Sequence, residues 1–361
     1  MRAAGQDSLK WTLKGATYFD HETHRFTSGD IEIDGEQVSA IKPVGASTLI
    51  RGVDVHEYVC TPGLVGTSID GQALLGAEPD RLVERGTTTG ALLFSCAGEC
   101  VRASRRTRAR LYAHLLLNEF SRARAAQRAA SARVYAPEIR VFERVAAQVA
   151  RQGVRLVPAV DCASVLSAHE VLYAQAFAHA LGLKLSVVLS QSSQAAQTFR
   201  ERFYCTEMQF LAFLQVLQPD LTVWGLSQLT RRDLHILRES GAKAIGLPEA
   251  TAEERVDAAT IKAAAALGDQ TCGRIAPGMR ADLCLFARMD RTLQGSGSES
   301  FLRLFQTGSP DAVIIAGKFV GGEFGESSDR YDKNAPASLV KKRQVDNREP
   351  RQNVLSQRAF F

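Results

Sequence analysis

Apolar and polar residues alternate along the first sixty residues of the chain. The stretches LKGATYFD (13–20) and DIEIDGEQVSAIKP (30–43) show this period of two, with turn-forming Gly, Asp and Pro residues around them. Successive side chains of a strand point to opposite faces, so the alternation predicts strands with one buried face and one solvated face. The N-terminal region is therefore predicted to form a small antiparallel sheet.

From Thr61 onward, short apolar runs alternate with longer helical patterns, which is typical of βαβ units and a parallel sheet. The clearest helices are 137–153, which has Pro137 in its first turn, and the alanine-rich 254–268, which Gly268 ends. Each strand candidate is apolar enough to be buried on both faces. The seven candidates are 61–69, 88–95, 110–118, 154–161, 183–190, 221–227 and 243–248.

A strand pattern returns after Gly268, in residues 273–289 and 311–324, with a turn at Pro277 and Gly278. These strands are expected to join the N-terminal sheet, so that one small β domain is built from both ends of the chain. The predicted domains are a composite β-sandwich (1–60 plus 270–326), a barrel domain (61–269) and a basic, polar tail (327–361).

Composition places the chain among ordinary soluble proteins. It has 361 residues, of which 45% are hydrophobic and 23% are charged. No apolar signal core opens the sequence, and no run reaches the ~18 apolar residues of a membrane span. The seven cysteines form no CxxC pair, which favours reduced thiols and a cytoplasmic location without a membrane partner.

The charge distribution does not point to nucleic acid. The net charge of +5 is mild. Two arginine-rich stretches, 102–110 and 122–128, form a basic region, but few aromatic residues interleave with them. A solvated helix surface is the favoured interpretation, and binding to phosphate, nucleic acid or an acidic partner is the alternative.

Two stretches carry a resemblance to a known family. VHEYVCTPGLV (55–65) and ATIKAAAALGDQTCGRIAPGMRADLCLF (259–286) resemble the amidohydrolase superfamily, in its cytosine-deaminase-like and chlorohydrolase-like branch. The resemblance implies a TIM-like (β/α) barrel with a composite β-sandwich. It also implies hydrolysis of a C–N bond by a metal-bound hydroxide, with a Glu as proton shuttle and an Asp that orients the nucleophile.

The chain departs from the family where the metal chemistry resides. The resemblance places Ser68 and Asp70 at the paired histidines of the first barrel strand. It places Val188 and Gln191 at the ligand and proton shuttle of the fifth strand, and Gly225 at the histidine of the sixth. The family's strand-eight Asp has no counterpart, so the barrel is expected to be incomplete or rearranged near its eighth strand. Val and Gly offer no lone pair and Gln is not a base near neutral pH, so no metal site and no cofactor are predicted.

The remaining polar groups at the strand ends are the candidate site residues. Asp70 and Asp161 are the candidate acid/base residues, and Ser68, Ser190 and Gln191 are the candidate substrate-binding residues, since barrel sites lie at carboxyl ends of strands. The alternatives are that Asp161 caps a helix and that Ser190 and Gln191 belong to an ordinary polar loop.

These features lead to two functional hypotheses. The preferred one is a degenerate amidohydrolase that has become a non-catalytic pseudoenzyme with a binding or assembly role. The alternative is an active hydrolase or lyase that uses the barrel pocket without the usual metal. A collapsed pocket filled by Val188 and Trp224 favours a scaffold. A closed concave pocket bounded by Asp70, Asp161 and Gln191 favours retained small-molecule binding or catalysis. A small molecule is the expected ligand in the barrel mouth. The open edge is expected to be covered by another element or a flattened helix of this chain, or by a partner in a homo-oligomer or hetero-complex.

Overall fold

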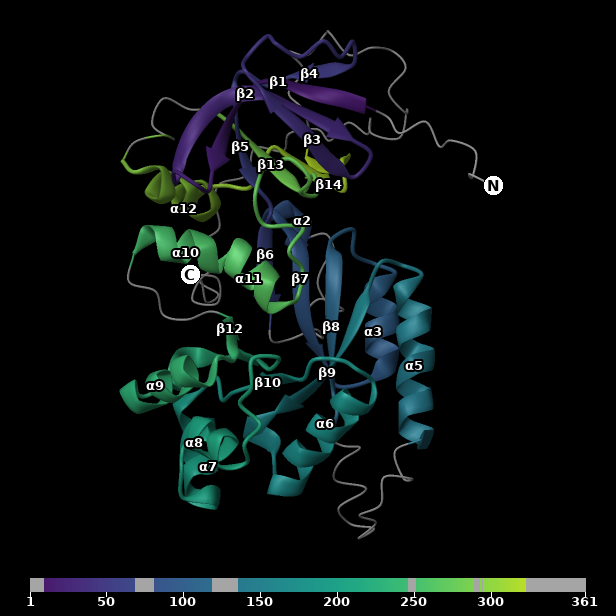
Figure 1. Ribbon diagram of the computed structural model, residues 1–361, viewed down its shortest axis with the longest axis vertical. Coiled ribbons are helices and arrows are strands. Elements are labelled where there is room, and N and C mark those ends of the chain that lie inside the picture. Colours follow the sequence, from purple (N-terminus) through teal and green to yellow (C-terminus); the bar gives the residue numbers. More distant parts are fainter. Residues whose placement is uncertain are drawn as a thin grey trace, which may run out of the picture.

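The computed structural model describes residues 10–68, 81–118, 136–245, 251–288, 293 and 295–322. Two sheets organise these residues, one of eight strands at one end of the molecule and one of seven parallel strands in the rest (Figure 1). The seven predicted parallel strands are confirmed, except that Thr61 and Pro62 of the first one belong to the eight-stranded sheet. Within the described residues, no helix is both long and apolar enough to cross a membrane.

The eight-stranded sheet draws its strands from both ends of the described chain. Its order is β15-β14-β13-β5-β1-β2-β3, with β4 paired to β1. Strand β5 lies between β1 and β13, so it joins the N-terminal strands to the later ones. The composite sheet is thus as predicted, while the exact domain boundaries stay a prediction. The strands are β1 (Lys10–Asp20), β2 (Arg25–Asp34), β3 (Gln37–Lys42), β4 (Gly52–Asp54), β5 (Tyr58–Pro62), β13 (Leu283–Ala287), β14 (Ala312–Ile315) and β15 (Lys318–Gly322).

The seven-stranded sheet runs in chain order from β6 to β12, and every neighbouring pair is parallel. Alternate side chains face opposite sides. On β8, Leu111 and Leu115 pack in the large core with the surrounding helices, whereas Tyr112 and His114 face inward. The strands are β6 (Leu64–Ser68), β7 (Thr87–Phe94), β8 (Arg110–Leu116), β9 (Arg155–Asp161), β10 (Ser186–Val188), β11 (Thr222–Trp224) and β12 (Lys243–Ile245).

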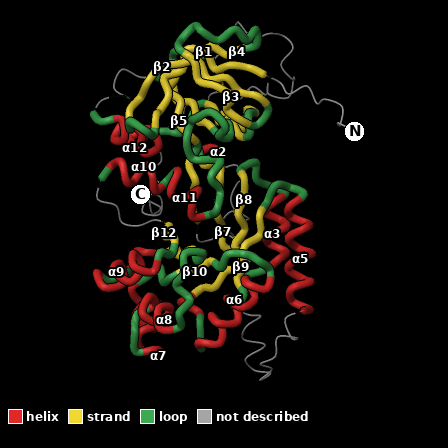
Figure 2. Tube along the Cα trace, in the orientation of Figure 1, coloured by secondary structure: helices red, strands yellow, loops and turns green. Residues whose placement is uncertain are grey.

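Helices cover the outer face of the parallel sheet (Figure 2). Helices α3, α5 and α6 pack against β8 and β9. The predicted helix at 137–153 is confirmed as α5, and its apolar residue Phe142 is buried beneath it. The helices are α2 (Arg81–Glu84), α3 (Ala97–Ser104), α5 (Ala136–Ala150), α6 (Ala168–Ala180), α7 (Ser193–Phe203), α8 (Glu207–Phe213), α9 (Arg231–Ser240), α10 (Ala252–Ala258), α11 (Ile261–Ala266) and α12 (Gly297–Thr307), with short 3₁₀ turns η2 (Cys162–Ser164) and η3 (Leu226–Gln228).

Helix α11 occupies the gap between the two edge strands of the parallel sheet. It contacts both β6 and β12, and its Ala263 and Ala264 pack against Val65 of β6. The backbone N–H of Val65 donates to the carbonyl of Ala259 at 2.9 Å, which holds the start of this segment to the strand. Among the described residues, a short helix therefore stands where an eighth strand would close the barrel. The prediction that another element covers the gap is confirmed, since α11 of this chain contacts both edge strands.

The prediction of a single helix over 254–268 is wrong, because the segment forms two helices, α10 and α11. The break lies at Thr260, whose backbone leaves the helical region at φ −134° and ψ −97°. Its hydroxyl donates back to the carbonyl of Val256 at 2.6 Å, a bond that competes with the helical ladder. Gly273 approaches the same backbone so closely that a Cβ there would lie 2.8 Å from the carbonyl carbon of Thr260. The break redirects α11 into the gap.

The turn between β1 and β2 packs against this break. His21 is 9% exposed, and its Nε2 lies 3.1 Å from the hydroxyl of Thr260. Nε2 of His24 lies 3.2 Å from Asp257 of α10. Residues 21–24 thus form a turn that ties the eight-stranded sheet to the gap-filling segment.

Two buried histidines make stability fall with acidification. Burial lowers the pKa of His21 to about 4, although Asp257 opposes the shift, and burial lowers the pKa of His114 to about 3. Unfolded histidines titrate near 6.5, so below about pH 6.5 the unfolded chain binds protons that the folded chain does not. Stability present above pH 6.5 is therefore expected to be lost as the pH falls toward 4. Between pH 6.5 and 4, the denaturant midpoint should fall less steeply with decreasing pH in His21→Gln than in the wild type. An unchanged dependence of the midpoint on pH would contradict this account.

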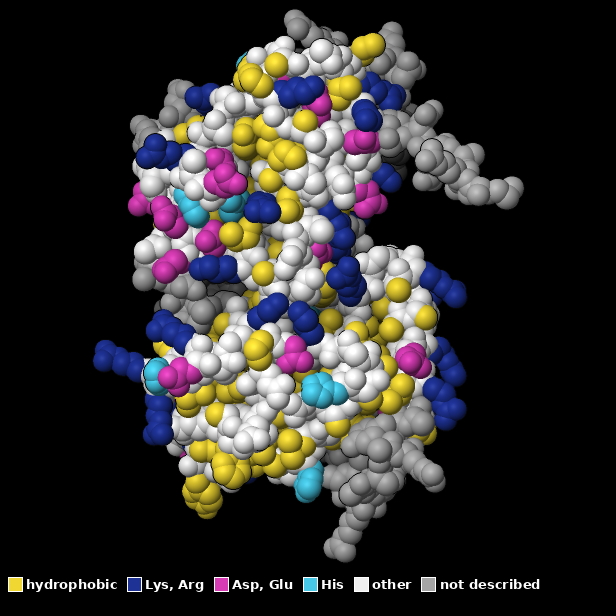
Figure 3. Space-filling view, in the orientation of Figure 1, with side chains coloured by type: hydrophobic (Ala, Val, Ile, Leu, Met, Phe, Trp, Pro, Cys, Tyr) yellow, Lys and Arg dark blue, Asp and Glu magenta, His cyan; other side chains and the backbone are white. Residues whose placement is uncertain are grey.

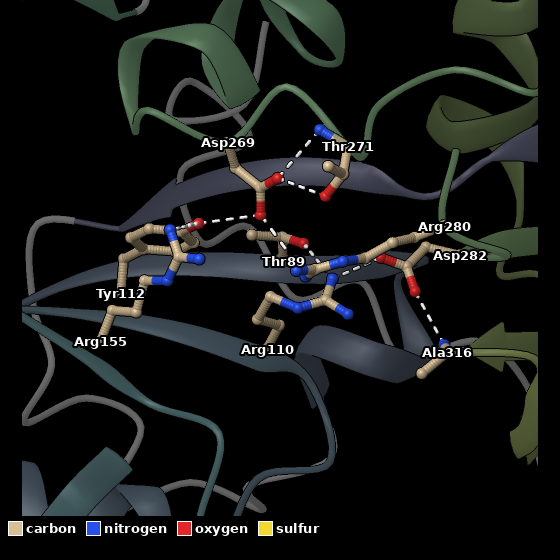
Figure 4. A network of polar contacts seen from close by, with 9 residues as sticks. All are labelled: Thr89, Arg110, Tyr112, Arg155, Asp269, Thr271, Arg280, Asp282 and Ala316. Atoms are coloured by element: carbon tan, nitrogen blue, oxygen red, sulfur yellow. Dashed lines mark hydrogen bonds and ion pairs between the residues drawn. The ribbon is translucent and has the colours of Figure 1, made fainter. Parts of the chain in front are cut away.

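A polar network joins the N-terminal ends of the barrel strands to the eight-stranded sheet (Figure 4). Arg110 begins β8, and its guanidinium donates to the carboxylate of Asp282, which immediately precedes β13. The other oxygen of Asp282 accepts from the backbone N–H of Ala316 at 2.8 Å. The side chain of Asp282 is only 1% exposed, so the pair is a buried ionic link between the two sheets.

Asp269 forms the second centre of the same network. Its carboxylate accepts from the hydroxyl of Tyr112 at 2.9 Å and from the backbone N–H of Thr271 at 3.0 Å. Burial alone would raise the pKa of Asp269, but the hydrogen bonds from Thr271 and Tyr112 lower it to about 2. Because both carboxylates of this network are paired within the chain and Asp282 links the two sheets, the network is assigned to stability.

Candidate functional site

The carboxyl ends of the parallel strands form the candidate site. Asp161 is the last residue of β9, and Ser190 and Gln191 follow β10. Ser68 is the last residue of β6, but its side chain lies outside the described residues, and so does all of Asp70. The structure therefore places three of the five candidate side chains.

Asp161 uses its carboxylate to cap the turn that follows it. One oxygen accepts from the backbone N–H of Ala163 at 3.1 Å, and the other accepts from the hydroxyl of Ser164. The backbone of Asp161 is also fixed, because Asn118, two residues after β8, accepts from its N–H at 2.9 Å and donates to its carbonyl at 3.0 Å. The observed contacts of Asp161 are those of the capping alternative. An acid/base role for Asp161 stays a prediction.

Ser190 is bound to a carboxylate that the sequence did not single out. Its backbone N–H donates to Glu207 of α8 at 2.9 Å, and its hydroxyl donates to the same carboxylate at 2.9 Å. Ser190 is 1% exposed and Glu207 is 8% exposed. Burial raises the pKa of Glu207, although the bonds from Ser190 favour the charged form.

A small cavity lies beside this pair, with room for about one water molecule. Its walls come from the ends of β10 and β11 and from helices α7 to α9, including Ser190, Arg200, Glu207, Gly225 and Asp233. Sequence reasoning missed Glu207 because it lies on a helix rather than at a strand end. The available signal was the capping box that begins at Thr206, which marks a helix start but not its proximity to Ser190.

Gln191 lies over Gly225. Its Nε2 donates to the carbonyl of Leu189 at 2.8 Å. Gly225 has φ +76°, and a Cβ there would lie 1.6 Å from the Gln191 Nε2. No side chain fits at position 225 unless Gln191 moves, so the amide fills the space that a residue on the sixth barrel strand would use.

The interior just below is filled by apolar side chains. Val188 is 2% exposed and Trp224 is 1% exposed. The Trp224 ring packs edge-on against His114, with centroids 4.2 Å apart. Ala266 of α11 belongs to the same core cluster as Trp224. The inside of the barrel is thus packed at this level by residues from β8, β10, β11 and α11.

The described residues do not fit a transition metal. Val188 and Gly225 carry no side-chain donor, and Gln191 occupies the space above Gly225. Within the part of the chain that the structure describes, no three His, Cys, Asp or Glu side chains gather in a group able to hold a metal ion. The absence of a metal site stays a prediction, because Asp70 and the side chain of Ser68 are not described.

Comparison with known proteins identifies the architecture. Residues 239–320 match the model of the Amidohydrolase family. A triazine hydrolase from Arthrobacter aurescens superposes with a TM-score of 0.66 at 13% identity, over 87% of this chain and 95% of that one. The fold is that of the amidohydrolases. The predicted family resemblance and fold class are confirmed.

Other amidohydrolase folds agree. An adenosine deaminase from Xanthomonas campestris, which contains bound zinc, gives a TM-score of 0.67 at 14% identity, over 86% of this chain and 92% of that one. Helicobacter pylori aminofutalosine deaminase gives 0.64 at 13% identity, over 86% of this chain and all of that one. A search of the curated proteins gave no match. At these identities, the similarity establishes the amidohydrolase fold and leaves the activity to be argued from the site.

Proposed function

We propose that this amidohydrolase-fold protein is a pseudoenzyme, which does not hydrolyse C–N bonds through a metal-bound hydroxide and acts instead as a binding or assembly partner. The observation that carries the proposal is the filled barrel interior. Trp224 and Val188 are buried at the level where the resemblance expects metal ligands, and Gln191 covers Gly225. A reaction centre needs room for a substrate and a hydroxide, and this packing leaves none at these positions.

The polar groups at the mouth support the same proposal. Asp161 caps its own turn, Ser190 binds Glu207, and Gln191 binds the carbonyl of Leu189. Each of these groups is engaged within the chain, so releasing it toward a substrate would break an existing bond. The mouth is organised to hold the strand ends together.

The alternative function, hydrolysis or lyase chemistry without the usual metal, has one observation in its favour. Glu207 is a buried carboxyl with a raised pKa that lies beside a serine hydroxyl. A perturbed acid in a small cavity is a common feature of catalytic sites as well as of structural ones. In this alternative, Asp70 or Asp161 would be the second acid/base group.

Metal content and turnover test the proposal together. Protein purified from zinc-supplemented cells is expected to hold zinc far below one equivalent by mass spectrometry. It is also expected to hydrolyse neither adenosine nor a chlorotriazine, the compound classes named for the structural neighbours. Stoichiometric zinc together with turnover that Asp70→Asn abolishes would overturn it. Metal-free turnover that Glu207→Gln abolishes would favour the alternative.

The partner remains part of the proposal. We infer either a homo-oligomer or a hetero-complex, and light scattering on the purified chain separates them. A particle mass of two or more times 39.3 kDa supports self-assembly. If the purified chain is a monomer, the assembly role requires a different protein as the partner.

A further inference from the structure

The N-terminal opening of the barrel carries a row of polar residues that point inward. Ser186 pairs with Thr222, and Thr222 pairs with Lys243, across β10, β11 and β12. The hydroxyl of Thr222 donates to the carbonyl of Ala266 at 3.0 Å, and Nζ of Lys243 donates to that of Ala265 at 3.1 Å. Both acceptors end α11, which fixes the row on the inner face of the sheet.

Lys184 is exposed and lies two residues before Ser186, in the segment that leads into β10. Its Nζ lies 3.4 Å from the position that a Cβ on Gly268 would take, next to the end of α11. The pKa of Lys243 is lowered, mainly by burial and further by the neighbouring ammonium group of Lys184. Two ammonium groups therefore meet at one opening.

Neither ammonium group is neutralised by the described part of the protein. No carboxylate of the described residues forms an ion pair with Lys184 or Lys243, whereas Arg110 and Arg280 nearby are paired with Asp282 and Asp269. Figure 3 shows several Lys and Arg side chains across the middle of this face of the molecule. The opening thus carries an excess of positive charge.

Ser186 provides an independent observation at the same place. Its side chain is fully buried, and its hydroxyl has no hydrogen-bond partner among the described residues. Buried hydroxyls in native proteins are nearly always paired. An unpaired donor in line with Thr222 and Lys243 indicates that a hydrogen-bond acceptor belongs there.

Helix capping accounts for only part of this arrangement. A cation near a helix C-terminus is favourable, and Lys243 makes that contact. However, α11 has only six residues, and one ammonium group already serves the carbonyl of Ala265. A second ammonium group adds repulsion that the helix end does not require.

We propose that the N-terminal opening of the barrel binds a small oxyanion, the phosphate or carboxylate group of a ligand, between Lys184 and Lys243, with the hydroxyl of Ser186 as a further donor. Lysine binds such groups as a point charge, and bonds to charged acceptors are roughly twice as strong as neutral ones. This site lies at the opposite strand ends from Ser190 and Glu207. It does not depend on whether the mouth is catalytic.

Phosphorus NMR of inorganic phosphate tests the proposal directly on the full chain. The phosphate resonance is expected to broaden several-fold with wild-type protein, at an ionic strength held constant with sodium chloride. The broadening should disappear in Lys184→Gln and weaken in Ser186→Ala. It should persist in Lys318→Gln, which removes one exposed positive charge from β15. Broadening that is absent in the wild type, or unchanged in Lys184→Gln, would overturn the site.

Thermal unfolding supplies a second measurement that separates anion binding from helix capping. Millimolar phosphate should raise the wild-type unfolding midpoint above that in chloride and should not do so in Lys184→Gln. Without phosphate, Lys184→Gln should unfold at the same or a higher temperature, because it removes repulsion from Lys243. A lower midpoint in Lys184→Gln without phosphate would show that Lys184 serves only the helix end, against the proposal. Acetate in place of phosphate distinguishes a carboxylate ligand from a phosphate ligand.

Discussion

Replacing Trp224 with alanine is expected to lower the free energy of unfolding by about 3–5 kcal/mol, the usual loss for a large aromatic residue in a packed core. Trp224 is among the largest fully buried side chains, and its ring contacts His114 inside the barrel. Its removal would leave a cavity among β8, β11 and α11. Urea denaturation of the two proteins measures the difference.

Trp224→Phe is the matched control. It keeps an aromatic ring and removes an indole N–H that has no hydrogen-bond partner among the described residues. The change is therefore expected to cost less than Trp224→Ala, because the cavity left by the smaller ring is smaller. If Trp224→Ala were as stable as the wild type, the barrel interior would not be packed as described, and the main support for a non-catalytic role would be lost.

Removing the carboxylate of Asp282 is expected to have an effect of similar size. Asp282→Ala leaves the guanidinium of Arg110 without its buried partner and removes the acceptor of the Ala316 N–H. Breaking one side of a buried pair costs about 3–5 kcal/mol. The denaturant midpoint should fall accordingly, and the change should report on the link between the two sheets.

Two controls separate the buried charge from the lost contact. The double variant Arg110→Met with Asp282→Leu removes both charges and should be more stable than Asp282→Ala alone. Lys10→Gln removes the ion pair between Lys10 and Asp34, in which the Lys10 side chain is 57% exposed. Because this pair is exposed, its loss should change the free energy of unfolding by less than about 1 kcal/mol. Equal losses in Asp282→Ala and Lys10→Gln would show that the pair at Arg110 is not buried in solution.

The elements that the sequence predicts well are those with a strong local pattern. The strand predicted at 110–118 appears as β8 because apolar residues dominate it, and the helix after Pro137 appears as α5. The composite sheet followed from similar local patterns at both ends of the chain. In each case, neighbours in sequence carry the information that the fold uses.

The break at Thr260 was not predictable in this way. Its alanine-rich surroundings favour one continuous helix. Besides the local bond from Thr260 to Val256, the contacts at the break come from outside the helical segment, from His21 and from the close approach of Gly273. Local propensity therefore favoured a longer helix than tertiary packing allows.

The candidate site shows the same limit. Sequence placed Asp161, Ser190 and Gln191 at strand ends, where they lie. It gave no indication that Ser190 would meet Glu207 or that Gln191 would lie over Gly225, since both contacts depend on how α8 and the strand ends pack. The filling of the interior by Trp224 likewise depends on α11, whose position a linear pattern does not encode.

The pairing of β5 with β13 has a consequence for biosynthesis. As the chain leaves the ribosome, β1 to β5 emerge long before their C-terminal neighbours β13 to β15 exist, and all seven barrel strands are made in between. Until β13 is synthesised, β5 remains an unpaired edge of the nascent sheet, and such edges are prone to misassembly. Chaperone binding during translation should therefore concentrate on the interval between synthesis of Pro62 and synthesis of Leu283.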